Sequence, residues 1–280
     1  MLKKAYLEIT NVCNLNCSFC RGTSRQKGFI ALEDFRTAAQ KLRPHTDYLY
    51  LHLMGEPLLH PRLGEILGIC AELGFRTVIT TNGTLLKEKE ELLLSAPALY
   101  KVSVSLHSFE ANNGADNGDS ALAEYVKNVC LFAEKAAKNG TIVSMRLWNN
   151  GGENQMNGII TAAIGQVFTG EYRQNRNGLT LSDNVYLEYG DKFDWPDLAA
   201  PRKNVSFCMG LRDQIGVLLD GTVVPCCLDA DGEIVLGNIF TEDIDTILRS
   251  PRAKAIYDGF SRRTAAEELC RRCGYAERFG

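Results

Sequence analysis

The stretch Cys13-Asn14-Leu15-Asn16-Cys17-Ser18-Phe19-Cys20 carries three cysteines on one short segment. Three thiolates can bind an iron–sulfur cubane, which has four irons, and leave one iron open to a ligand that is not protein. Tetrahedral zinc with a fourth ligand from elsewhere is the alternative, but zinc sites more often pair cysteines two residues apart. The spacing of three and then two residues therefore favours a [4Fe-4S] cluster on Cys13, Cys17 and Cys20.

The composition is that of an ordinary globular protein. The chain has 280 residues, of which 45% are hydrophobic and 23% are charged, and its net charge is -3. This length holds one α/β barrel with an accessory module. The lack of an overall basic charge argues against a nucleic-acid partner. No apolar run approaches the roughly 20 residues that span a bilayer, and no signal-peptide core follows Met1, so we expect a cytoplasmic protein with no membrane partner.

Strand and helix patterns alternate from residue 5 to residue 168. The expected strands cover residues 5–10, 48–54, 76–81, 101–107 and 141–148. The expected helices cover residues 32–42, 61–73, 85–94, 121–138 and 156–168. Repeated βα units predict a parallel sheet in an α/β fold, here a partial (β/α)6 TIM-type barrel whose last strand starts at Val185. Residues 170–184, which are rich in Asn, Gly, Arg and Ser, are predicted to form a loop.

The chain after the barrel divides into a linker and a small module. We expect the barrel over residues 1–185, the linker over 186–207 and the module over 208–280. In the module, Asp220-Gly221 predicts the turn of a β-hairpin, and short helices are expected over 244–248 and 253–257. A hairpin and small helices supply too little apolar material for a core of their own, so we expect bound metal to stabilise the module.

The ten cysteines indicate metal binding rather than disulfides, because we expect a reducing compartment. Four of them lie in the module and could together ligate a second cubane in full: Cys208, Cys226, Cys270 and Cys273. A structural zinc ion is the alternative for this set. Cys227 is left without a role, and Cys70 and Cys130, each alone in a helical pattern, are predicted to be small buried hydrophobic residues.

These motifs resemble those of the radical S-adenosylmethionine (SAM) enzymes, and the resemblance covers nearly the whole chain. The first three cysteines match the C-x3-C-x2-C signature of that family, in which the open iron binds the amine and carboxylate of SAM. The resemblance implies that SAM is cleaved to methionine and a 5′-deoxyadenosyl radical, which abstracts a hydrogen atom from the substrate. The module, with Gly221 five positions before Cys226, resembles the auxiliary cluster modules called SPASM and twitch. A chain that ends seven residues after Cys273 fits the single-cluster twitch form, as in the dehydrogenases that oxidise 2-deoxy-scyllo-inosamine.

The resemblance also assigns SAM contacts to residues at the ends of the expected strands. Gly55-Glu56-Pro57 resembles the family's GGEP motif, with Met54 in place of the first glycine, and implies that Glu56 lies near the SAM ammonium. Thr81-Asn82-Gly83 resembles the TNG stretch of these enzymes, although a solvated turn is the alternative at both motifs. Phe19 matches an apolar position near the SAM adenine. The expected SAM-binding residues are Phe19, Gly55, Glu56, Pro57, Thr81, Asn82, Ser103, Ser105 and Arg146.

Three residues near the same strand ends are candidates for catalysis. Arg146 alternates with Ser144 on its expected strand, and a buried arginine needs an anion, either the SAM carboxylate or the substrate. A salt bridge to a neighbouring strand is the alternative. His107 could contact the substrate or be a hydrogen-bonded core histidine, and Glu188 is placed near the same rim by the last expected strand.

A second cluster leaves two activities open. In the first, it accepts an electron from the substrate radical, which makes the protein an oxidoreductase acting on a small molecule. In the second, the enzyme modifies a ribosomally made peptide by crosslinking or epimerisation. A strand that begins by residue 5 leaves no room for a peptide-recognition domain before it, which favours a small molecule. Either activity needs an electron donor such as flavodoxin or ferredoxin. A non-enzymatic iron–sulfur electron carrier is the remaining alternative, and it predicts no SAM binding.

Overall fold

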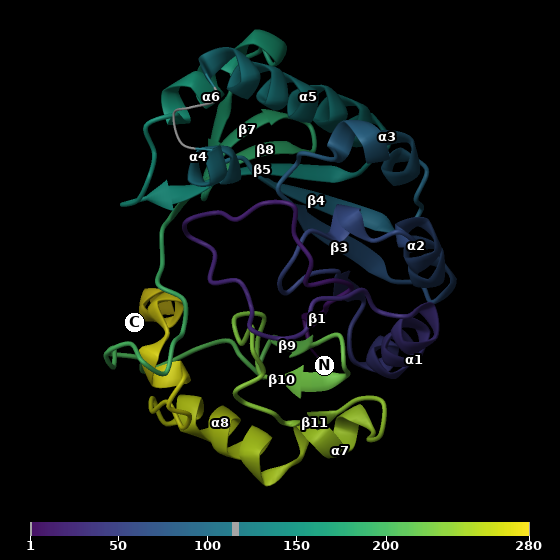
Figure 1. Cartoon of the computed structure of the whole chain (residues 1–280), viewed down its shortest axis with the longest axis vertical. Helices are drawn as coiled ribbons and strands as arrows, with labels where there is room; N and C mark the ends of the chain where they lie inside the picture. Colours follow the sequence, from purple (N-terminus) through teal and green to yellow (C-terminus); the bar gives the residue numbers. More distant parts are fainter. Residues whose placement is uncertain (1, 114–117, 280) are drawn as a thin grey trace.

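Six parallel strands alternate with helices in the order that the sequence predicts. They are seen in a computed structural model, which describes residues 2–113 and 118–279. The strands are β1 (Lys4–Leu7), β2 (Tyr48–Tyr50), β3 (Arg76–Thr81), β4 (Leu99–Ser105), β5 (Ile142–Asn150) and β8 (Val185–Asp191). The helices between them are α1 (Leu32–Leu42), α2 (Leu63–Glu72), α3 (Leu86–Leu94), α5 (Gly118–Lys138) and α6 (Asn157–Val167), and they follow the outer side of the sheet in Figure 1. This confirms an α/β fold of the partial TIM-barrel kind.

The two faces of the sheet differ in polarity. On the outer face, Leu49 and Val102 pack into the core together with Phe35 of α1 and Phe132 of α5. The periodic apolar residues of the helices account for this packing, since each helix turns one apolar stripe to the sheet. Side chains on the inner face are largely polar. Residues that are paired in parallel register point to the same side of the sheet, so the members of such a pair share this face. Two such pairs are Thr80 with Ser103 and Ser105 with Arg146.

Residues 170–184 form a hairpin, so the predicted loop is wrong. β6 (Arg173–Asn175) and β7 (Gly178–Ser182) pair antiparallel, and β7 pairs antiparallel with β8. Within the turn, Asn177 N donates to Asn175 Oδ1 over 2.9 Å. The polar composition concealed the hairpin, because β6 depends on pairing with β7 and β7 on pairing with β8, and both strands bury little apolar surface of their own.

Two smaller differences lie at the ends of strands. The strand expected over 48–54 ends at Tyr50, and the chain from Leu51 to Met54 leaves the sheet. Residues 108–113, for which no element was predicted, form the short helix α4 (Ser108–Asn113). Both differences place loop or short helical structure at the C-terminal ends of the strands, which is the end where ligand sites form in parallel sheets.

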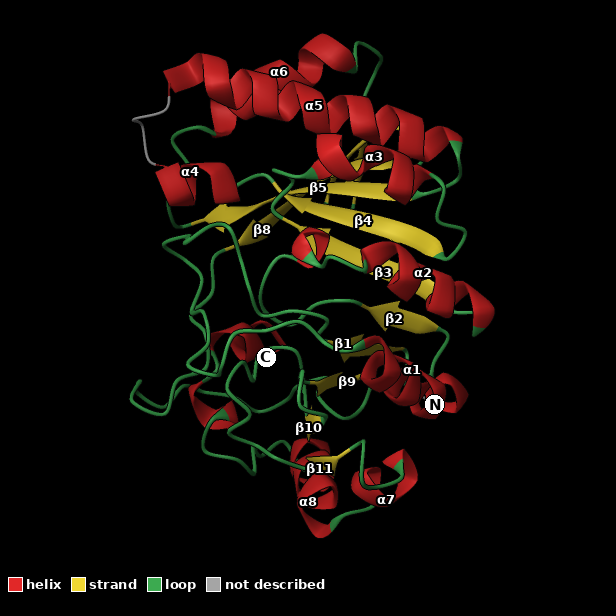
Figure 2. Cartoon of the chain, turned by 45° about the vertical axis from the view of Figure 1, so that its right-hand side comes forward, coloured by secondary structure: helices red, strands yellow, loops and turns green. Residues whose placement is uncertain are grey.

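The C-terminal module extends the same sheet. Its predicted hairpin consists of β9 (Gln214–Val217) and β10 (Thr222–Val224), followed by β11 (Gly237–Asn238), α7 (Ile244–Leu248) and α8 (Pro251–Ser261). β9 pairs in parallel with β1, with Ala5 opposite Ile215, so the eleven strands run in the order β11-β10-β9-β1-β2-β3-β4-β5-β8-β7-β6. Figure 2 shows α7 and α8 beyond this end of the sheet. The sequence did not predict that the module and the barrel share backbone hydrogen bonds.

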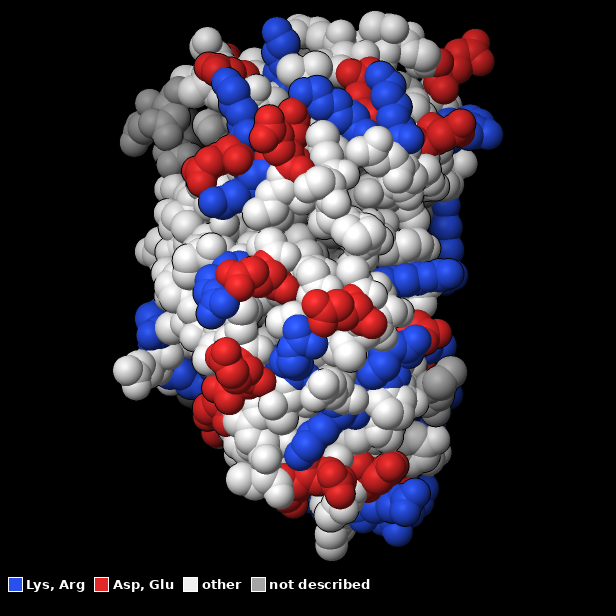
Figure 3. Space-filling view, turned by 90° about the vertical axis from the view of Figure 1, so that its right-hand side faces the viewer, with Lys and Arg blue, Asp and Glu red and all other residues white. Residues whose placement is uncertain are grey.

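The charged residues of the surface are mixed in sign. On the face seen in Figure 3, Lys and Arg side chains alternate with Asp and Glu, and neither sign gathers into one patch. This distribution agrees with the small net charge of -3. None of the helices within residues 2–113 and 118–279 is long and apolar enough to cross a membrane.

Candidate active site

The first three cysteines lie on the long loop between β1 and α1, and Thr10 and Asn11 close the base of this loop. Asn11 Nδ2 donates to Gln26 O over 3.0 Å, and Asn11 Oδ1 accepts from Gly28 N over 2.8 Å. Thr10 Oγ1 donates to Gly28 O over 2.8 Å. Both side chains are buried. The closed base directs the loop over the C-terminal ends of the strands, where the sequence places the site.

The same three cysteines line one cavity of about 370 Å³, together with Met54 and Gly55. Burial raises the pKa of Cys13 and raises that of Cys17 to about 11. Thiols with raised pKa values stay protonated at pH 7, so a bound metal must displace the protons. Three thiols on the wall of one open cavity fit three corners of a cubane and leave the fourth corner free.

Glu56 braces the strand ends beside this cavity. The side chain is buried, Oε1 accepts from Leu58 N over 3.0 Å, and Oε2 accepts from Asn82 N over 2.7 Å. Burial raises the pKa of Glu56 to about 7, although the two backbone donors oppose this shift. The side-chain amide of Asn82 donates to Asn14 Oδ1 over 2.9 Å and lies 3.9 Å from Cys13 Sγ. The end of β3 therefore supports the cysteine loop directly.

A second cavity, of about 140 Å³, lies in the C-terminal module. All four cysteines predicted as ligands line it, namely Cys208, Cys226, Cys270 and Cys273. Much of the remaining wall is apolar and includes Phe260, Leu269 and Phe279. Burial raises the pKa of Cys226 well above its usual range, and the neighbouring thiols raise it further. Four such thiols ionise together only around a bound positive centre, so this cage fits a fully ligated cubane.

Neither set of cysteines is arranged to hold a single metal ion. Across the described part of the chain, no three His, Cys, Asp or Glu side chains converge closely enough for one ion. Zinc binds its thiolates at about 2.3 Å around one point, whereas a cubane spreads them over separate irons.

A third cavity, of about 210 Å³, lies between the two cysteine sets, and we call it the central cavity. Phe19 of the first cysteine loop lines it, and so do Cys227 and Leu228, which directly follow Cys226. Polar side chains from the strand ends and from the segment after β8 also line it, including Thr80, Ser105, His107, Arg146 and Lys192. The rest of the wall is largely apolar and aromatic and includes Leu53, Trp148, Phe193 and Trp195. The central cavity thus contacts residues next to both cysteine sets.

Arg146 is one of the charged side chains of the central cavity, and it is ion-paired from behind. Its Nε lies 3.5 Å from Glu188 Oε2, and its guanidinium carbon lies 4.6 Å from the ring centre of Trp148. Glu188 also pairs with Lys101 Nζ at 3.3 Å. The interstrand salt bridge that was the alternative for Arg146 is therefore present. Among the residues that the structure describes, its buried Nε finds no hydrogen-bond partner, and Glu188 does not line the central cavity.

His107 packs against the cysteine loop through Phe19. Its Nδ1 lies 3.0 Å from Arg146 O, and its ring centre lies 4.8 Å from that of Phe19. Burial lowers the pKa of His107, so the imidazole is neutral at pH 7. A neutral ring packed on Phe19 holds that side chain at the central cavity.

Five of the residues predicted to bind SAM line neither the central cavity nor the first cysteine cavity, namely Glu56, Pro57, Thr81, Asn82 and Ser103. Thr81 Oγ1 accepts from Gly83 N over 3.0 Å, and Pro57 starts a buried helical turn. Ser103 is fully buried on β4, and among the described residues its hydroxyl has no hydrogen-bond partner. SAM contacts from the predicted residues stay a prediction. Cys70 and Cys130 are fully buried, as the sequence predicts.

Sequence reasoning missed several residues of the central cavity. Cys227 was left without a role, yet its neighbour Cys226 lines the second cavity while Cys227 lines the central one. His52 and Lys192 also line the central cavity. A signal existed for His52, which alternates with Tyr48 and Tyr50 along one face of an expected strand. No signal could place Lys192, because the segment after β8 has no periodicity.

Comparison with known proteins agrees with this geometry. The model of the radical SAM superfamily matches residues 7–154, and that of the iron–sulfur cluster-binding SPASM domain matches residues 208–274. The antilisterial bacteriocin subtilosin biosynthesis protein AlbA of Bacillus subtilis is 24% identical over 97% of this chain. That match covers 65% of AlbA, so the chain spans less than two thirds of this relative.

Two solved structures share the fold. BtrN in complex with AdoMet and 2-DOIA is 17% identical, with a TM-score of 0.58, and the match covers 98% of this chain and 93% of BtrN. SuiB of Streptococcus suis bound to the precursor peptide SuiA is 16% identical, with a TM-score of 0.55, over 99% of this chain and 70% of SuiB. The two domains imply SAM and two [4Fe-4S] clusters as cofactors. Since the radical SAM model matches more than half of the 280 residues, the protein belongs to the radical SAM superfamily and carries a SPASM-type module.

Proposed function

We propose that the protein oxidises a small molecule in the central cavity and passes one electron to the auxiliary cluster. The observation that carries this proposal is the place of that cavity. Phe19, directly before Cys20, and Cys227, directly after Cys226, both line it. A substrate held there would contact Phe19 and Cys227, each of which is adjacent in sequence to a proposed ligand of one cluster.

When bound, the first cluster, held by Cys13, Cys17 and Cys20, and SAM would supply the radical chemistry that removes a hydrogen atom from the substrate. The chain supplies position and shielding. Gly55, Glu56 and Asn82 are proposed to hold SAM beside the first cysteines, in line with their places at the strand ends. Loss of a proton and one electron from the substrate radical would complete a two-electron oxidation.

The central cavity offers a few polar side chains to hydroxyl, carbonyl or anionic groups of a substrate, on a wall that is otherwise largely aromatic and apolar. Arg146 and Lys192 can donate to such groups, and Ser105 and Thr80 can both donate and accept. Burial lowers the pKa of His52 to about 3, so this histidine adds a neutral hydrogen-bonding group and no charge. In this proposal Arg146 and His107 contact the substrate, while Glu188 holds Arg146 in place.

A second candidate is the modification of a peptide without net oxidation, and Cys227 favours it. A thiol at the substrate cavity can return a hydrogen atom to a carbon radical, which would invert a stereocentre. The sulfur-centred radical left on Cys227 would then need one electron and one proton, and the adjacent Cys226 would bring the auxiliary cluster within reach. The similarity to AlbA and to SuiB, which is a peptide-bound structure, supports this class of substrate.

Both candidates need an external reductant for the first cluster, and we propose a flavodoxin or a ferredoxin. Its electron must reach Cys13, Cys17 or Cys20. Cys13 and Cys20 are exposed, so a docked partner could approach the cluster loop from solvent.

The test is an anaerobic incubation of the reconstituted protein with SAM, dithionite and size-separated small-molecule and peptide fractions of a cell extract. Oxidation predicts 5′-deoxyadenosine together with a product in the small-molecule fraction that lacks a pair of hydrogen atoms. Epimerisation instead predicts a peptide of unchanged mass in water that takes up one deuterium from D2O. The control is the Cys13→Ala, Cys17→Ala variant, which should form no 5′-deoxyadenosine. Absence of 5′-deoxyadenosine from the intact protein would contradict both candidates.

A further inference from the structure

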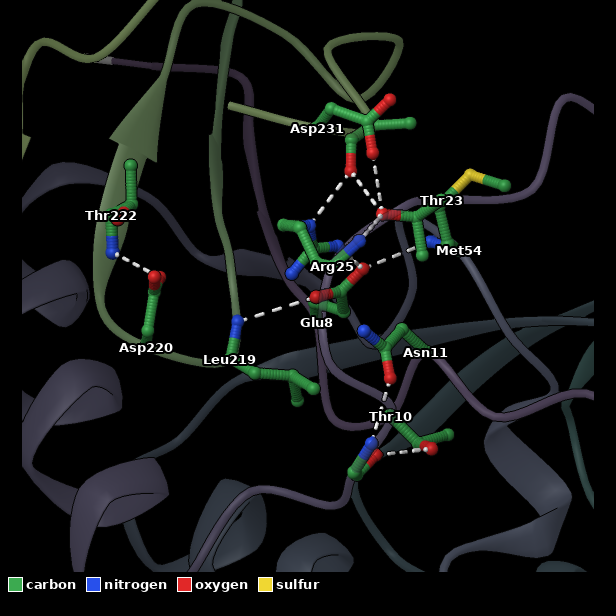
Figure 4. Close-up of polar contacts among 12 residues, drawn as sticks. Glu8, Thr10, Asn11, Thr23, Arg25, Met54, Leu219, Asp220, Thr222 and Asp231 are labelled. Carbon is green, nitrogen blue, oxygen red and sulfur yellow. Dashed lines mark hydrogen bonds and ion pairs between the residues drawn. The ribbon is translucent and has the colours of Figure 1, made fainter. Parts of the chain in front are cut away.

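A compact group of polar residues joins the first cysteine loop to the auxiliary module. We call it the Asp231 latch: Arg21, Thr23, Ser24 and Arg25 on the cysteine loop, Ala230 and Asp231 on the module, and Glu8 after β1. Figure 4 shows Thr23, Arg25, Glu8 and Asp231 close together, with Leu219 of the module beside them. Arg21, the first latch residue on the cysteine loop, directly follows Cys20, and Asp231 on the module lies four residues after Cys227.

Asp231 is the centre of the latch. Its Oδ1 accepts from Thr23 Oγ1 over 2.7 Å, from Ser24 N over 2.8 Å and from Ser24 Oγ over 3.1 Å. Its Oδ2 pairs with Arg21 Nη2 at 3.2 Å. The Asp231 side chain is 14% exposed, and its bonds to Thr23 and Arg21 are partly buried, whereas its bonds to Ser24 lie at the surface. One carboxylate thus binds three residues that directly follow the last ligand of the first cluster.

Arg25 and Glu8 provide a second connection, in which Glu8 is fully buried and Arg25 is partly buried. Arg25 Nε donates to Ala230 O over 2.8 Å, and Arg25 Nη2 donates to Glu8 Oε1 over 2.7 Å. Glu8 is 0% exposed, and its Oε2 accepts from Leu219 N over 3.2 Å. Glu8 also accepts from Met54 N over 3.3 Å, next to the first cysteine cavity. The pair therefore links both cysteine loops to the strand ends.

The segment after β8 is attached to the same cysteine loop. Trp195 Nε1 donates to Phe19 O over 3.0 Å, and Arg21 Nη1 donates to Pro196 O. Trp195 and Phe19 both line the central cavity. Arg21 therefore contacts Asp231 of the module with one nitrogen and Pro196, in the segment after β8, with another. The cysteine loop, the module and the segment after β8 thus meet at this arginine.

We propose that Asp231 is a positioning residue that fixes the spacing between the two clusters and the width of the central cavity between them. Its contacts join the segment that follows Cys20 to the loop that follows Cys227. The first cysteine loop contributes Phe19 to the wall of that cavity, and the module contributes Cys227 and Leu228. The proposal rests on the two clusters and not on which substrate is oxidised.

The test compares Asp231→Ala with Asp220→Ala in the full-length, anaerobically reconstituted protein. Asp220 is the matched control, because it lies in the same module and its carboxylate accepts from Thr222 N within its own turn, away from the cysteine loop. Hydrogen exchange of peptides that cover residues 20–26 and 228–234 reports on the latch. We expect exchange to become about tenfold faster in Asp231→Ala and to stay unchanged in these peptides in Asp220→Ala.

Spectroscopy separates positioning from a merely structural role. The spectral signal of the magnetic coupling between the two reduced clusters should broaden in Asp231→Ala, because the spacing between the clusters is less fixed. The iron content should stay at about eight per chain. Asp231→Asn keeps an acceptor for Thr23 and Ser24 but loses the ion pair with Arg21, so it should give an intermediate exchange rate. Unchanged exchange and coupling in Asp231→Ala would overturn the proposal, and so would a loss of iron that accounts for both changes. None of these measurements involves a substrate, so their outcome is independent of the proposed reaction.

Discussion

At the scale of single residues, the adjacent cysteines Cys226 and Cys227 point into different cavities, so the direction of each side chain determines which role it can have. Cys226 lines the cavity of the four module cysteines, and Cys227 lines the central cavity. Burial raises the pKa of Cys227, while a hydrogen bond with Tyr6 and the charge of Lys4 oppose the rise. The sequence shows two adjacent cysteines. Only the directions of their side chains distinguish the one in the four-cysteine cavity from the one that lines the central cavity.

This division predicts opposite effects of two neighbouring substitutions. Cys226→Ala should lower the iron content of the reconstituted protein from about eight to about four, because it removes one of four ligands of the auxiliary cluster. Cys227→Ala should keep about eight, because its thiol is outside that cage. Iron and acid-labile sulfide analysis, with absorbance near the thiolate-to-iron bands, measures both. Equal iron loss in the two variants would show that Cys227 is a ligand.

At the scale of secondary-structure elements, the turn after β2 determines how closely the cysteine loop can approach the sheet. Gly55 has a φ of 76°, and a Cβ placed on it would lie 2.6 Å from Thr10 O and 2.8 Å from Asn11 Cα. Both atoms belong to the backbone at the base of the cysteine loop. The resemblance to a glycine-rich motif therefore has a local physical reason in this chain, namely contact between two backbones.

Gly55→Ala should consequently destabilise the protein by about 1–3 kcal/mol and loosen the loop that carries the first three cysteines. Gly68→Ala is the control, because Gly68 lies on the exposed side of α2 with open space around it. That change should leave the free energy of unfolding unchanged or raise it by up to about 1 kcal/mol. Urea unfolding of the anaerobic apoprotein checks both values. A Gly55→Ala protein as stable as wild type would contradict the steric argument.

At the scale of the whole molecule, the auxiliary module and the barrel share one sheet. β9 adds to β1 in parallel, and Ile215 on β9 is fully buried in the main core. A module with this backbone pairing cannot leave without exposing the edge of β1. We therefore propose that the two regions, although separate in the sequence, unfold as one unit.

Ile215→Ala tests this coupling. Removal of the buried side chain should cost about 2–5 kcal/mol, and the loss should appear equally in both regions. Hydrogen exchange in urea, followed for peptides of β3–β5 and of α8, should report the same midpoint for both regions before and after the change. Leu131→Ala, at a partly exposed position of α5, is the control and should shift neither midpoint appreciably. Separate midpoints for the two sets of peptides would show that the module unfolds by itself.

The sequence alone determined much of the fold. Helical and strand periodicity placed all six parallel strands and their helices within a few residues, because the apolar side of each element is encoded in its own local sequence. It failed over residues 170–184, where β6 and β7 depend on pairing with β8. It also shortened α8, which begins at Pro251 and is capped by Ser250 Oγ, and it overlooked α4.

The sequence by itself also determined the chemistry: the spacing of Cys13, Cys17 and Cys20 and the four module cysteines identified two clusters, because thiolate ligands are recognisable by residue type. Only the tertiary structure decided what lies between the clusters. It placed Cys227 and His52 on the central cavity, set Glu188 behind Arg146, and joined the two cysteine loops through Asp231. The physical reason is that these contacts join residues far apart in the chain, and no local pattern encodes the side on which a long loop meets its partner.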